Sequence, residues 1–120
     1  MKNALILAAL VEVGAGLALG FYPSLALRLL FGTEVTGAGL PLSRVTGFAL
    51  LALGIACWPA GNNRNAVAGV VAYGVLVALF LTWLGTTGQW TGPLLWPTVV
   101  LHTCISGALF WLWLRRSGAR

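Results

Sequence analysis

Charged residues are scarce in this chain. Only 8% of its 120 residues are Asp, Glu, Lys or Arg, whereas a soluble domain carries roughly 25%. Hydrophobic residues make up 59%, so a soluble fold would expose a large apolar surface and aggregate. The lack of charge therefore excludes an ordinary soluble domain and predicts one small domain, residues 1–120, embedded in a membrane.

Acidic residues are the rarest charged type. Glu12 and Glu34 stand against seven Lys and Arg, which leaves a net charge of +5. Nucleic-acid binding needs basic side chains gathered in a patch, but here they lie at the edges of apolar runs, where membrane topology needs them. We therefore expect the lipid bilayer as a partner and exclude nucleic acid.

The chain also has few residues suited to metal binding or catalysis. Its two cysteines, Cys57 and Cys104, form no C-x-x-C pair, and His102 is its single histidine, so no metal site is expected. It contains no nucleophile motif, paired carboxylates or phosphate-binding glycine loop. We assign no catalytic residue and rank an enzyme third among the function classes. No cofactor is predicted, although a bound lipid or quinone stays open.

Long apolar runs, by contrast, are abundant. Each has about the 20 residues that a helix needs to cross a bilayer, and backbone groups that face lipid must be paired within a helix. The sequence therefore predicts an all-α, polytopic four-transmembrane-helix bundle with spans near residues 4–22, 41–60, 66–88 and 94–114.

A short interfacial helix is expected after the first span. Pro23 ends that span, Ser24 is expected to cap the next helix, and the leucine-rich segment that follows is typical of a helix in the interface.

The basic residues predict the orientation. Four spans put both termini and the "GNNRN" turn on one side, together with Lys2, Arg64, Arg115, Arg116 and Arg120. The opposite side carries only Arg28, Arg44 and Glu34. The positive-inside rule then predicts that both termini are cytoplasmic.

A carboxylate interrupts the first run, "ILAALVEVGAGLALG". On a helical wheel, Glu12 shares its face with small residues, while bulky side chains lie opposite. The small face holds Ala8, Ala9, Ala15 and Gly16, and the bulky face holds Ile6, Leu10, Leu17 and Phe21. Because small residues let helices approach closely, Glu12 is expected to point into protein.

Helix depth predicts the neighbours of this carboxylate. At 1.5 Å rise per residue, Glu12, Tyr73 and Ser106 lie roughly 10–12 Å from the cytoplasmic end, and His102 about 18 Å. We therefore expect a midplane ion- or ligand-binding cluster of these four residues. Arg44 lies nearer the outside, where its long side chain reaches inward or snorkels to the headgroups.

Two interpretations of the cluster stay open. An ionisable residue inside a membrane is a functional candidate by default. The alternative is a structural Glu12 that is hydrogen-bonded to Tyr73 or Ser106 and holds the helices together.

The stretches "VEVGAGLALGFYPSLALRLLFG" and "PLSRVTGFALLALGIACW" resemble the DoxX-like superfamily of small four-helix bacterial membrane proteins. The shared pattern is a glycine-rich first span, a proline break, a leucine-rich interfacial segment, and an arginine and a glycine that open the second span. The resemblance covers the first half of the chain. It implies a four-helix bundle, often linked to redox or respiratory membrane systems, and transfers no catalytic residue.

The leading functional hypothesis is transport: a carrier or channel for an ion or small ligand, built as a homo-oligomer around Glu12. Small-residue pairs such as Ala52/Ala56 and Ala68/Ala72 are suited to contacts between copies. The alternative is a non-catalytic accessory subunit of a larger membrane complex, such as a redox or respiratory one.

Overall fold

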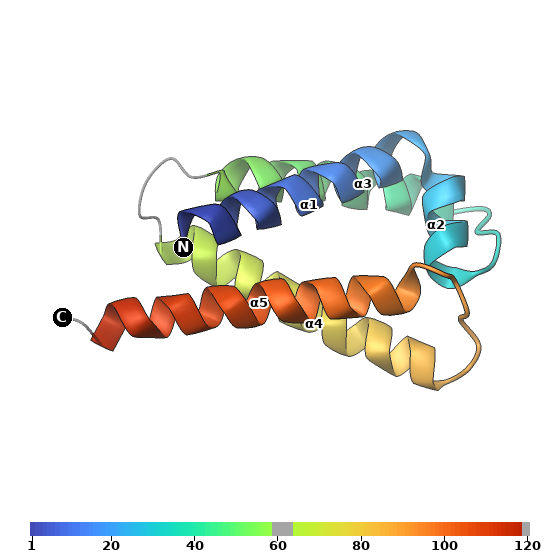
Figure 1. The fold of residues 1–120 in the computed structure, drawn as a ribbon. Helices are drawn as coiled ribbons and strands as arrows, with labels where there is room; N and C mark the ends of the chain where they lie inside the picture. Colours follow the sequence, from blue (N-terminus) through green and yellow to red (C-terminus); the bar gives the residue numbers. More distant parts are fainter. Residues whose placement is uncertain (59–63, 119–120) are drawn as a thin grey trace.

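Figure 1 presents the computed structural model of the chain, in which residues 1–58 and 64–118 are described. These residues form five helices: α1 Lys2–Phe21, α2 Pro23–Phe31, α3 Gly39–Cys57, α4 Arg64–Thr86 and α5 Leu95–Gly118. All but α2 are long and apolar enough to cross a membrane. This confirms the all-α fold class, and the four long helices overlap the four expected spans. Arg120 and most of the "GNNRN" turn lie outside the described residues.

Most helix ends lie within two residues of the expected spans, and the C-terminal ends of α3 and α5 differ by more. Helix α5 continues beyond residue 114 to Gly118, because Arg115 and Arg116 extend the helix past its apolar run. The guanidinium of Arg115 stacks on the ring of Trp111, 3.7 Å from its centroid. Helix α3 ends at Cys57, and Trp58 has a ψ of 130°, the extended conformation that a following proline favours.

The expected cap of the interfacial helix was wrong. Helix α2 begins at Pro23, its N-cap residue is Tyr22, and no side chain caps it, so Ser24 lies inside the helix. Proline suits the first helical position because its ring presets φ and it has no N–H that needs a partner. Gly32 ends the helix with a φ of 75°, a left-handed conformation that glycine adopts without strain.

The four spanning helices form two pairs, α1 with α3 and α4 with α5 (Figure 1). Glycines allow α1 and α3 to pack backbone against backbone: a Cβ on Gly47 would lie 2.5 Å from the Gly20 nitrogen and 2.7 Å from the Gly16 oxygen. The bulky side of α1 faces away from the protein, and Leu10, Leu17 and Phe21 are exposed, as the helical wheel predicts. Ile6 is intermediate.

Both ends of the bundle join the two pairs. Near the termini, which lie at the same end in Figure 1, buried residues from all four long helices form one cluster: Leu5, Ala8, Ala9, Cys57, Val67, Val70 and Leu109.

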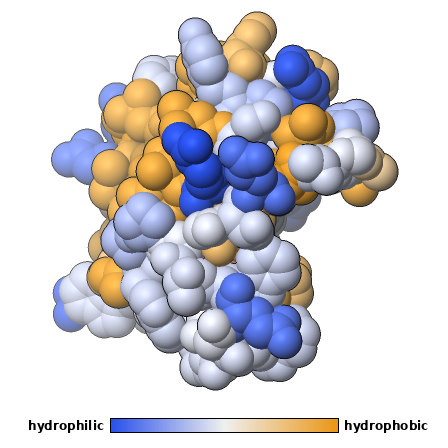
Figure 2. Space-filling model, turned by 90° about the vertical axis from the view of Figure 1, so that its right-hand side faces the viewer, coloured by the Kyte–Doolittle hydropathy of each residue, from blue (hydrophilic) through white to orange (hydrophobic). Residues whose placement is uncertain are grey.

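At the other end, α2 lies across the bundle and accepts backbone hydrogen bonds from the α4–α5 connection. The amide of Thr91 donates to the Phe31 carbonyl (3.2 Å) and that of Leu94 to the Leu29 carbonyl (2.9 Å). Figure 2 views this end, where hydrophilic side chains in blue lie beside hydrophobic ones in orange. Such a mixed surface suits the membrane–water interface.

Candidate functional site

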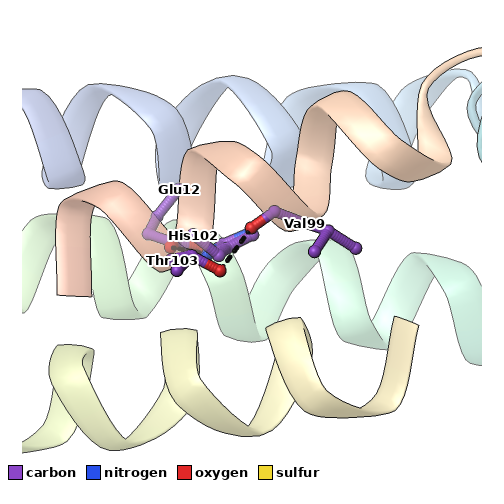
Figure 3. A network of polar contacts seen from close by, with 4 residues as sticks. All are labelled: Glu12, Val99, His102 and Thr103. Carbon is purple, nitrogen blue, oxygen red and sulfur yellow. Dashed lines mark hydrogen bonds and ion pairs between the residues drawn. The ribbon is translucent and has the colours of Figure 1, made fainter. Parts of the chain in front are cut away.

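Glu12 lies halfway along α1 and points toward α5 (Figure 3). Its neighbours on the same helix face, Ala8, Ala9 and Gly16, are buried with it. These small side chains bring α3 and α5 close to α1, so that the carboxylate is only 3% exposed. The interpretation that Glu12 faces protein instead of lipid is therefore correct.

The ionisable side chain next to Glu12 is that of His102. Its Nδ1 lies 4.0 Å from Glu12 Oε1, and its side chain is buried. This separation exceeds the roughly 2.7–3.2 Å of a direct hydrogen bond, and a single intervening hydrogen-bonding atom bridges gaps of this kind. The second carboxyl oxygen, Oε2, is buried and has no hydrogen-bond partner among the described residues. The pair thus keeps hydrogen-bonding capacity that residues 1–58 and 64–118 do not satisfy.

Two further side chains complete the cluster on the α4–α5 side. The ring of Tyr73 meets that of His102 edge to face, with centroids 5.7 Å apart. Ser106 follows one turn after His102 on α5 and is 4% exposed. The structure therefore brings together four of the expected residues: Glu12, Tyr73, His102 and Ser106.

Gly74 is the site residue that the sequence reasoning missed. A Cβ at this position would overlap Ser106 Oγ and lie 3.6 Å from His102 Nδ1. The absence of a side chain on α4 is what lets these two polar groups face it. The only signal in the sequence was one more glycine inside a span, which does not distinguish Gly74 from its neighbours.

Arg44 does not join the cluster. Its Nη1 donates a hydrogen bond to the Gly20 carbonyl oxygen (3.1 Å), and Gly20 lies about 12 Å along α1 from Glu12 at 1.5 Å per residue. Arg44 therefore ties α3 to the α2 end of α1 and supplies no positive charge next to Glu12.

The cluster concentrates most of the buried polarity of the described residues. Their buried polar side chains are Glu12, Ser43, His102 and Ser106, and three of these four belong to it. The Thr103 hydroxyl, also drawn in Figure 3, instead donates to the Val99 carbonyl on its own helix (2.8 Å). Hydroxyls of this type satisfy themselves locally, whereas Glu12 and His102 face each other from two different helices, 4.0 Å apart.

The chain matches no protein-family model. Searches of curated proteins and of solved structures likewise find no match. The resemblance to the DoxX-like superfamily accordingly stays a prediction, and the geometry of the cluster is the basis for function.

Proposed function

We propose that this protein is a small carrier or channel of the bacterial inner membrane that binds an ion or small ligand at the Glu12–His102 pair. The observation that carries the proposal is the buried Glu12 Oε2, which has no partner among the described residues and lies beside a histidine whose Nδ1 is 4.0 Å from Oε1. A small hydrogen-bonding ligand could therefore bond to a carboxyl oxygen of Glu12 and to the imidazole nitrogen of His102 at the same time.

The cost of burying Glu12 in the membrane favours a binding role over a purely structural one. An ionisable side chain at the centre of a membrane helix costs about 2.5–3.5 kcal/mol on insertion scales. A carboxyl group kept only to hold helices together recovers such a cost when its oxygens are hydrogen-bonded. Glu12 leaves one oxygen unsatisfied, so the chain bears a cost that a bound proton, cation or hydrogen-bonding ligand offsets.

The test uses purified protein in liposomes, with flux of protons, ammonium, sodium and potassium measured beside mass spectrometry of copurified small molecules. We expect Glu12→Gln to fold and to reduce flux or ligand content at least tenfold, a loss of about 1.4 kcal/mol. Gly14→Ala is the matched control on α1, because a Cβ there meets nothing within 4 Å. Unchanged flux and ligand content in folded Glu12→Gln contradict the proposal, as does wild-type protein that shows neither.

A second candidate is a non-catalytic accessory subunit of a larger membrane complex, and a specific observation favours it. Two small-residue rows are exposed on the long helices, Ala52/Ala56 on α3 and Ala68/Ala72 on α4. Exposed rows of this kind favour close packing with further helices, either of a second copy or of a partner. The resemblance to DoxX-like proteins adds a redox or respiratory complex as the expected context.

The mass of the protein in mild detergent or nanodiscs separates these candidates. A homo-oligomer with Glu12-dependent flux supports the carrier or channel. Copurification with other membrane subunits in fixed stoichiometry supports the accessory subunit, provided that Glu12→Gln leaves flux and ligand content unchanged. A monodisperse monomer weighs against the channel, because one chain offers four thin helices with little room for a pore.

A further inference from the structure

An open groove runs along the outside of the α4–α5 pair. Its volume is about 430 Å³, and its walls are mainly apolar: Val71, Val75, Ala78 and Leu79 from α4, and Gly107 and Phe110 from α5. The hydroxyls of Thr103 and Ser106 are its polar lining groups. Both helices are long and apolar enough to cross a membrane, which would turn this groove toward the bilayer instead of water.

The groove borders the polar cluster. Ser106 is only 4% exposed yet lines the groove, so it forms part of the floor. The same hydroxyl lies against Gly74, at the point where a Cβ would also come within 3.6 Å of His102 Nδ1. Ser106 therefore separates the membrane-facing groove from the His102–Glu12 pair.

We infer that this groove admits a hydroxyl-bearing, lipid-soluble molecule from the bilayer. The hydroxyl of this molecule lies at Ser106 and from there forms hydrogen bonds with the His102–Glu12 pair. The inference rests on the proposed function and names the ligand class of that site. The apolar walls match the apolar body of such a molecule. Ser106 and, beyond it, the His102–Glu12 pair with its unpartnered carboxyl oxygen match the polar end.

A hydroxyl fits this site better than other polar groups. Thr103 already donates its hydroxyl proton to Val99, which leaves Ser106 as the groove hydroxyl that belongs to the cluster. A hydroxyl both donates and accepts hydrogen bonds, so it is matched to Ser106 and to a carboxyl group in either protonation state. A charged head group would have to be desolvated in the bilayer, and no Lys or Arg among residues 1–58 and 64–118 lines the groove to compensate it.

The experiment compares two probes on full-length protein in nanodiscs: a photoreactive octanol with a diazirine on its alkyl chain, and the matching photoreactive octane. Labelled residues are located by mass spectrometry. We expect octanol to label the groove walls about fivefold more than octane, the discrimination that one hydrogen bond supplies. Ser106→Ala should remove this preference without changing the octane signal.

The second variant fills the groove with a larger side chain. Gly107 lines the groove and a Cβ there meets nothing within 4 Å, so Gly107→Leu adds a side chain to the groove wall and should remove most octanol labelling. Gly69→Leu is its matched control, because Gly69 is equally free of neighbours, lies on α4 and does not line the groove. Far-UV circular dichroism establishes that each variant is folded.

Each outcome separates the inference from the proposed function. Equal labelling by octanol and octane means that lipid tails alone fill the groove, and it overturns the inference, as does a preference that survives Ser106→Ala. If these results accompany a flux defect in Glu12→Gln, only the inference fails. If octanol labelling depends on Ser106 while Glu12→Gln changes neither flux nor labelling, the proposed function and the route to Glu12 both fail.

Discussion

The backbone-to-backbone contact between α1 and α3 yields the sharpest stability prediction, for Gly47→Ala. An added Cβ would lie 2.5 Å from the Gly20 nitrogen and 2.7 Å from the Gly16 oxygen. Both are backbone atoms of α1, so no side-chain rotation relieves the overlap. Helices α1 and α3 must move apart by roughly 1 Å to reach the 3.5 Å or more of an ordinary contact.

That displacement affects the whole α1–α3 pair. A gap of 0.5–1 Å forfeits about a quarter to a half of the attraction between facing atoms, and association of helices within lipid depends on such packing because it has no hydrophobic drive. We expect Gly47→Ala to lower the free energy of unfolding by about 2–3 kcal/mol, the upper part of the range for overpacked sites.

Gly14→Ala is the matched control within the same pair. Gly14 lies on α1, is exposed, and a Cβ there meets nothing within 4 Å. The change should leave stability equal or raise it by up to about 1 kcal/mol, the propensity difference between alanine and glycine in a helix.

The assay is reversible unfolding in mixed micelles at increasing SDS fraction, followed by far-UV circular dichroism and tryptophan fluorescence. A Gly47→Ala protein that unfolds at the same SDS fraction as Gly14→Ala would refute the close backbone packing of α1 and α3.

Three further predictions address orientation, the buried acid and the α2 end. Gly118→Cys should react with an impermeant maleimide only once the inner membrane is opened, and Gln89→Cys should react before it; the reverse pattern contradicts cytoplasmic termini. Glu12→Leu should lose about 1–3 kcal/mol of stability because it leaves its buried polar neighbours unpaired, while Glu12→Gln keeps most of it; equal thermal stability of the two variants counts against a polar cluster. Gly92→Ala places a Cβ onto the Leu30 carbonyl, so hydrogen exchange of the α4–α5 connection should accelerate, and unchanged protection would show that this contact does not hold α2.

Much of this protein follows from its sequence alone. Apolar runs of sufficient length without charge leave a chain in lipid only the helix, so the four spans and their approximate limits were predictable. The helical wheel of α1 also placed Glu12 correctly, because one helix has a known period and small residues mark the face that packs. Tyr73, His102 and Ser106 were matched to Glu12 by depth, a coordinate that membrane helices share.

Other features depended on the tertiary structure. The depth argument places residues along the membrane normal but not around it, so it could not tell that Arg44 contacts Gly20 instead of the cluster. Nor could it separate Gly47 and Gly74 from the other glycines, because a close approach is a property of two helices and no single helix encodes it. The pairing of α1 with α3 and of α4 with α5 (Figure 1) arises from such mutual fits. Within the described residues, the same arrangement leaves Glu12 Oε2 without a hydrogen-bond partner and forms the groove beside Ser106 between α4 and α5.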